Sequence, residues 1–179
     1  MSVNNSAPMM QHLTTQFAHP IFEPKCGMAS VSTLTFPPLN QGVTPTMDPL
    51  TLEEAVRMAS AARAEADKLN IKVTISILDP RGDVIVVNRM DGALWRSVPI
   101  SEGKAAASAA WNTPSGELTE RWSQPTFQAL SMRENGRLIP WQGALPIRRS
   151  DGTMVGAIGV SGAKSKLDEQ VASAGLSAL

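Results

Sequence analysis

The spacing of apolar residues changes sharply between residues 51 and 77. Thr51-Leu-Glu-Glu54 has the pattern of a capping box, and the apolar residues that follow recur every three or four positions, which predicts an amphipathic helix. From Ile71 to Ile77 the apolar residues instead alternate with polar ones, which predicts a half-buried strand. The expected buried face of the helix consists of Leu52, Val56, Ala59, Ala62, Ala66 and Leu69.

The middle of the chain continues with further predicted elements. Asp79-Pro-Arg-Gly82 is a tight-turn sequence, so residues 84–87 are expected to return as the second strand of a hairpin. The alanine-rich stretch from Ile100 to Trp111 predicts a helix that approaches its neighbours closely. One or two short helices are expected between residues 113 and 127, and residues 138–147 are expected to be extended.

The C-terminal part predicts a second hairpin and a last helix. Ser150-Asp-Gly152 is typical of a hairpin turn, and residues 154–160 read as a core strand. Ser165 and Asp168 have the spacing of a helix cap, and Leu167, Val171 and Ala174 are expected to face inward. The order of these elements predicts an α+β domain in which helices cover an antiparallel sheet.

Residues 1–48 differ from the rest of the chain. They hold both histidines, His12 and His19, the single cysteine, and prolines at positions 8, 20, 24, 37, 38 and 45, with a further proline at 49. Their apolar residues favour an extended arm that docks on its own or a neighbouring subunit over a solvated tail. We therefore divide the chain into a proline-rich arm, residues 1–48, and a domain, residues 49–179.

The charge balance limits the classes of partner that are expected. Sixteen basic and sixteen acidic residues give no net charge, so the chain lacks the broad positive field that nucleic acid or an anionic membrane usually requires. We expect a small-molecule ligand or a protein partner. Cys26 has no partner for an internal disulfide, no Cys-x-x-Cys zinc site exists, and no signal peptide is recognisable, so we expect a cytoplasmic protein without a metal site.

The segment Gly156-Ala-Ile-Gly-Val-Ser-Gly162 raises the question of a phosphate loop. Its glycine spacing does not fit the dinucleotide fingerprint or the Walker loop. Gly156 and Gly159 are expected to let a helix or a ligand approach the strand backbone. Ser161 and Gly162 precede the last helix, whose free amides are able to receive a carboxylate.

Four motifs together resemble one known family. LTLEEA at 50–55, LDPRGDVIVVNRMDGA at 78–93, SEGKAAASAA at 101–110 and DGTMVGAIGVSG at 151–162, followed by Asp168, are similar to the GlcG/HbpS family, also called the haem-degrading domain. A similar module forms the C-terminal part of PduO-type proteins. The resemblance implies about five antiparallel strands flanked by helices, and homo-oligomers. The chain departs from the family pattern at Gly143-Ala-Leu-Pro146 and Ser108.

Lys104 is the main candidate for chemistry. It is an ammonium group in an otherwise alanine-rich helix, so it either reaches solvent or is held for a ligand anion, and the resemblance favours a site. Arg89 and Asp91 flank Met90 and are expected on one face of a strand end, where a structural ion pair competes with a catalytic role for Asp91. The further candidates for ligand contact are Arg89, Trp141, Gly143, Gly159, Ser161 and Gly162.

Residues 50–179 contain no His, Cys or Tyr, which removes the usual nucleophile and base pairs and the commonest haem ligands. Haem would then be held by His12 or His19, by a methionine, or through its propionates by Lys104 and the arginines.

Two functions remain open, beside a third possibility of a structural accessory subunit whose Lys104 does no chemistry. The first is a homo-oligomeric protein that binds haem or another planar anionic ligand. The second is an enzyme without a cofactor, of the isomerase, lyase or hydrolase/dehalogenase type, acting on a small unsaturated acid such as a muconate-like product of aromatic catabolism. In that enzyme Lys104 would hold a carboxylate or act as a base.

Overall fold

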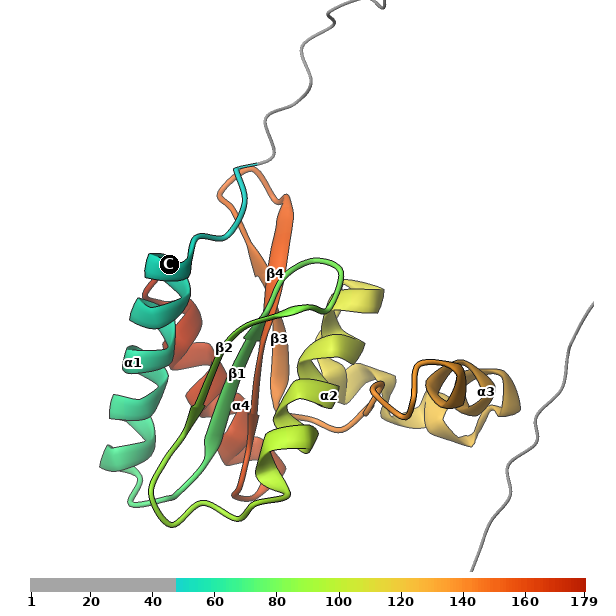
Figure 1. Cartoon of the computed structure of the whole chain (residues 1–179), viewed down its shortest axis with the longest axis horizontal. Helices are drawn as coiled ribbons and strands as arrows, with labels where there is room; N and C mark the ends of the chain where they lie inside the picture. Colours follow the sequence, from blue (N-terminus) through green and yellow to red (C-terminus); the bar gives the residue numbers. More distant parts are fainter. Residues whose placement is uncertain (1–47) are drawn as a thin grey trace, which may run out of the picture. The chain divides into compact units, whose positions relative to one another are not determined.

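The computed structural model describes residues 48–179, which form a four-stranded antiparallel sheet in the order β2-β1-β4-β3 with helices on both faces (Figure 1). The prediction of an α+β fold is confirmed. The strands are β1 (Thr74–Leu78), β2 (Val84–Arg89), β3 (Ala144–Arg148) and β4 (Met154–Ser161). The helices are α1 (Leu52–Lys68), α2 (Ser97–Trp111), the 3₁₀ helix η1 (Ser115–Ser123), α3 (Pro125–Arg133) and α4 (Ser165–Leu176).

The expected fifth strand is absent from the described residues. Of the segment 138–147 that was predicted to be extended, the strand includes only the part from Ala144 onward. The amide of Ile139 donates to the carbonyl of Gly103 on α2. Ile139 is thus bound to α2, and the segment reaches the sheet only near its end, where the Gly143 carbonyl accepts the amide of Val160 on β4 at 2.8 Å. The prediction of about five strands was one too many.

Helices α1 and α4 pack together on one face of the sheet, and α2 covers the other face (Figure 1). The predicted capping box of α1 is confirmed, because the Glu54 amide donates to the Thr51 hydroxyl and the Thr51 amide donates to the Glu54 carboxylate. The predicted buried face was partly wrong: Leu52 and Val56 are exposed. The buried face is instead Ala55, Met58, Ala59, Ala62 and Ala66.

The buried face of α1 is rotated about the helix axis relative to the predicted one, and the packing of α4 explains this difference. Gly175 of α4 lies against α1, where an added Cβ would meet the carbonyl of Met58 at 3.2 Å and the Cβ of Ala62 at 3.2 Å. Small residues on both helices allow this close approach. The face of α1 that carries Leu52 and Val56 is consequently turned away from α4.

Strand β1 is buried on both faces, so the prediction of a half-buried strand was wrong. Ile75 and Ile77 enter the core beneath α1 and α4. On the opposite face, the Thr74 and Ser76 hydroxyls lie 2.7 Å from the hydroxyls of Ser97 and Ser101 on α2. The polar residues of the alternation are thus paired with a helix, which removes the cost of burying them.

The turns that flank the strands agree with the sequence. Asp79 caps the first hairpin, because one of its carboxylate oxygens accepts the amides of Arg81 at 2.8 Å and Asp83 at 2.9 Å. The turn at residues 150–152 joins β3 to β4, as expected.

Glycine in β4 serves helix packing. A Cβ on Gly159 would collide with the carbonyl oxygen of Ser101 and would lie 2.9 Å from the Cβ of Ala105. Helix α2, which begins three residues earlier than predicted, therefore lies directly on the backbone of β4. The close approach that the glycine pattern predicted is made by this helix.

Helices η1 and α3 extend to the side of α2, away from the sheet (Figure 1). The rings of Trp111 at the end of α2 and Phe127 on α3 stack with centroids 4.8 Å apart. This contact joins the lateral helices to the layered domain. Within the described part of the chain, no helix is long and apolar enough to cross a membrane.

Candidate functional site

Lys104 lies inside the domain. Its side chain is 3% exposed, and its ammonium donates to the Asp168 carboxylate at 2.8 Å and to the carbonyl oxygen of Val160 at 3.0 Å. Helix α2 presents Lys104 toward the end of β4, on the same face as Ser97 and Ser101. Lys104 therefore neither reaches solvent nor offers an unpaired positive charge to a ligand anion.

Asp168 is the ion-pair partner of Lys104, although a helix-capping role was predicted for it. It was expected to cap α4 together with Ser165, but the N-cap residue is Lys164 and no side chain caps this helix. The second carboxylate oxygen of Asp168 accepts the amide of Ala163 at 3.0 Å. Burial raises the pKa of the Asp168 carboxyl above its usual range, and the Lys104 ammonium opposes that shift.

Gly143 closes the space beside this ion pair. A Cβ at Gly143 would lie 2.8 Å from the Lys104 ammonium nitrogen, 2.9 Å from the Asp168 Cβ and 2.9 Å from the Val160 carbonyl oxygen. Its φ of +132° also lies in the region that favours glycine. Gly143, predicted as a ligand contact, is therefore a neighbour of Lys104 that makes room for the ion pair.

The Lys104–Asp168 pair borders a hollow of about 250 Å³, here called the polar hollow. The first residues of α2 and the residues that lead into α4 form its walls. It is lined by Leu94, Arg96, Ser97, Ile100, Lys104, Trp141, Ser161, Gly162, Ala163, Ser165 and Asp168. Four of the predicted contact residues, Lys104, Trp141, Ser161 and Gly162, thus come together.

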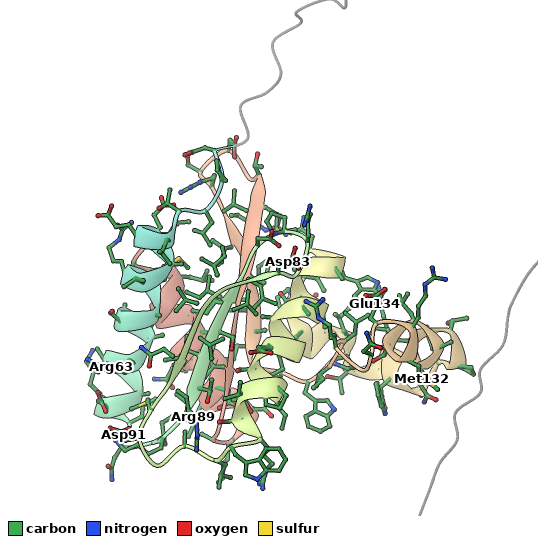
Figure 2. The ribbon with its side chains drawn as sticks, in the orientation of Figure 1. Arg63, Asp83, Arg89, Asp91, Met132 and Glu134 are labelled. Atoms are coloured by element: carbon green, nitrogen blue, oxygen red, sulfur yellow. The ribbon has the colours of Figure 1, made fainter. Side chains whose placement is uncertain are left out.

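A second hollow of about 700 Å³, here called the apolar hollow, lies between α2, η1 and α3. Met132, labelled in Figure 2, belongs to its α3 wall. Trp141 and Ile100 line both hollows. The apolar hollow is lined by Ile100, Trp122, Gln128, Ser131, Met132, Gly136, Leu138, Ile139, Pro140 and Trp141.

Arg89 and Asp91 are not part of either hollow. Arg89 donates twice to the carbonyl oxygen of Ala93, at 2.6 and 3.1 Å, and Asp91 is exposed (Figure 2). Neither residue forms an ion pair within residues 48–179, so the structural ion pair predicted for this strand end is wrong. Arg89 holds the loop that carries Leu94 and Arg96 to the polar hollow. Gly159 also lies outside, because helix α2 covers it.

The described residues offer few ligands for a metal. Among residues 48–179, no three His, Cys, Asp or Glu side chains are placed to hold an ion. Met132 supplies a thioether in the wall of the apolar hollow. His12 and His19 lie outside the described residues, and so does the arm predicted for residues 1–48, apart from its last residue.

Sequence reasoning missed two site residues, Arg96 and Asp168. Arg96 follows an exposed loop and resembles any surface arginine in the sequence. Asp168 had a visible signal, because a carboxylate three residues into a helix is often a cap. Only the fold shows that β4 and α2 bring Lys104 within reach of it.

The fold and the two hollows define a class: a small α+β domain with a large apolar hollow and, next to it, a smaller polar hollow that borders a buried ion pair. The chain belongs to the HbpS-like family, whose description is "Haem degrading protein HbpS-like" and whose model matches residues 50–177. The resemblance seen in the sequence motifs is thereby confirmed.

Three known proteins illustrate this membership. The corrinoid adenosyltransferase PduO of Citrobacter freundii is 30% identical over 73% of this chain, which spans only 39% of that protein's length. The crystal structure of HbpS is 36% identical, with a TM-score of 0.64 over 73% of this chain and 90% of HbpS. The crystal structure of a PduOC:heme complex is 28% identical, with a TM-score of 0.66 over 73% of this chain and 95% of PduOC.

Proposed function

We propose that this chain is a binding protein for haem or a similar planar ligand that carries a carboxylate. The observation that carries the proposal is the apolar hollow of about 700 Å³, which has the size and lining of a small-molecule site. The indoles of Trp122 and Trp141 offer flat apolar surface to a ring system. The haem complex of the similar PduOC structure supports haem as the first ligand to test.

The residues of the two hollows fit such a ligand in part. The apolar hollow is suited to a macrocycle, and the polar hollow beside it is suited to an acidic substituent. For an axial ligand to haem iron, the described walls supply only the sulfur of Met132. When bound, haem would supply its iron chemistry, while this chain would supply the apolar walls and the charges around them.

The enzyme alternative needs a Lys104 that is free to act as a base or to hold a substrate carboxylate. The ammonium of Lys104 is instead occupied by Asp168 and by the Val160 carbonyl. Catalysis would require that this pair open, whereas ligand binding requires no such step. We therefore favour the binding function for this site.

We also propose that the chain assembles with copies of itself. Its support is the exposure of apolar side chains on α1 and β2, where Leu52, Val56 and Val84 are each about half exposed or more. Native mass spectrometry of the full chain would show a discrete oligomer, and a monomer at micromolar concentration would contradict the assembly.

A hemin titration tests the binding function. We expect a saturable change in the Soret band with the full chain. Trp141→Ala removes a wall of the apolar hollow and is expected to weaken binding about tenfold or more, since truncation of an aromatic anchor in a binding site costs about 2 kcal/mol or more. Trp95→Ala is the matched control, because Trp95 is 75% exposed and lines neither hollow. Absent saturation, or equal weakening by both variants, would overturn the proposal.

A further inference from the structure

We infer that the polar hollow is a carboxylate subsite, in which Arg96, Ser161 and the first amides of α4 hold one acidic group of the ligand while Lys104 does not. This inference rests on the proposed function and specifies which residues read the charge of the ligand.

Ser161 provides the first evidence for this subsite. The residue is 6% exposed, yet its hydroxyl has no hydrogen-bond partner among residues 48–179. Every fully enclosed polar side-chain atom of the described residues does have a partner. The Ser161 hydroxyl therefore keeps some contact with solvent. Because Ser161 lines the polar hollow, that free donor is available to a group bound there.

The N-terminus of α4 provides further donors. This helix has 12 residues, and no side chain caps it. The first amides of an α-helix have no partner within the helix, and they carry partial positive charge. Ser165, the first residue of α4, lines the polar hollow together with Ser161. An anion in the hollow would thus meet a hydroxyl and a helix N-terminus at the same place.

Arg96 provides the net charge. It lines the hollow from the N-cap position of α2, and the first turn of α2 carries no acidic residue. Among the ion pairs of residues 48–179, none involves Arg96. A guanidinium group forms two parallel hydrogen bonds with a carboxylate, so Arg96 suits a carboxylate in particular.

Lys104 and Asp168 set the electrostatic background of the hollow. Asp168 would repel a ligand carboxylate if it stood alone, but the Lys104 ammonium pairs with one of its oxygens and the Ala163 amide with the other. The pair therefore contributes little net charge, and the guanidinium of Arg96 makes the net charge of the polar hollow positive. The hollow's volume of about 250 Å³ suits one small acidic group beside the larger apolar hollow.

Hemin and hemin dimethyl ester, whose two carboxylates are blocked, separate this inference from the proposed function. We expect the full chain to bind the ester about tenfold more weakly than hemin. Arg96→Gln and Ser161→Ala are expected to weaken hemin binding about three- to tenfold and to leave the affinity for the ester unchanged. Arg63→Gln is the control, since Arg63 is exposed on α1, the helix on the opposite face of the sheet from α2 (Figure 2).

The outcomes distinguish the two proposals. Equal binding of hemin and the ester would overturn the carboxylate subsite and leave the binding function intact. The ester could also bind more weakly than hemin to the parent chain and, by the same factor, to the Arg96→Gln and Ser161→Ala variants. That result would place the acidic group elsewhere and also overturn the subsite. Saturable binding of neither compound would overturn the binding function and the subsite with it. Thermal unfolding of each variant verifies that its fold is retained.

Discussion

The ammonium nitrogen of Lys104 lies 2.8 Å from a carboxylate oxygen of Asp168, although 64 positions separate the two residues in sequence. Both side chains are almost completely excluded from solvent. Two opposite charges in such a place stabilise each other only while both are present, because a single buried charge has no compensation.

Removal of one partner is therefore expected to cost more than removal of both. Lys104→Met or Asp168→Asn should each lower the free energy of unfolding by about 3 kcal/mol. The double variant should lose less stability than either single variant, and so far less than the sum of the two losses. Urea unfolding measures these values, with Lys68→Met as control because the Lys68 side chain is 75% exposed. Additive losses would show that the pair is not coupled.

Gly143→Ala tests the space beside the pair. The new methyl group would contact Lys104, Asp168 and the Val160 carbonyl at 2.8–2.9 Å, so we expect a loss of about 2–4 kcal/mol. Gly152→Ala separates sterics from backbone strain, since Gly152 has a φ of +86° and open space around it. That control should cost about 1 kcal/mol. Equal thermal destabilisation by the two variants would refute the steric explanation.

The buried hydroxyl pairs predict an asymmetry. Ser101 has a second acceptor in the Val98 carbonyl, whereas the Ser76 hydroxyl has Ser101 as its side-chain partner. Ser101→Ala therefore leaves Ser76 unpaired and should cost about 1–3 kcal/mol, and Ser76→Ala should cost less. Chemical denaturation of the two variants and of the double variant provides the comparison. A larger loss for Ser76→Ala would contradict this assignment.

The ionisation of Glu54 makes the free energy of unfolding depend on pH in the acid range. Its hydrogen bonds to Arg149 and Thr51 lower its pKa from 4.5 to about 2. The folded state therefore holds the carboxylate more strongly than the unfolded state does, so the stabilisation is complete above about pH 4.5 and is lost as the pH falls toward 2. Because the Glu54 side chain is 20% exposed, we expect only about 1–2 kcal/mol.

Glu54→Gln isolates this effect, since glutamine also satisfies a capping box but carries no charge for Arg149. The variant should be less stable than the parent near pH 6, and the difference should shrink toward pH 3. Unfolding curves across this range measure the difference. A constant difference would exclude titration of Glu54 as its cause.

The fold was largely predictable from residue periodicity and turn chemistry. The capping box at Thr51, the turn at Asp79 and the alanine-rich helix each specify local structure through short-range interactions. Leu52 and Val56 were misassigned because the rotation of α1 depends on Gly175, which lies more than a hundred residues away. Periodicity identifies an apolar face but does not show which part of it a distant helix covers.

The site was less predictable than the fold. Lys104 was recognisable as a charge in an apolar helix, and Ser161 and Gly162 as donors before a helix. Asp168 and Arg96 were not recognisable, because their roles depend on the end of β4 lying between the first residues of α2 and α4. Arg89 and Asp91 were misassigned because their proximity in sequence suggested a pair that the loop geometry does not form.

The closeness of Gly143 to Lys104 and Asp168 also has an evolutionary consequence. Any side chain at position 143 would displace the pair, and either member of the pair without the other would be costly. We therefore expect the three positions to change together among relatives. A lineage that loses the lysine is expected also to lose the aspartate and to accept residues other than glycine at position 143. Substitution patterns at these three sites would then distinguish subgroups of the family more sharply than overall identity does.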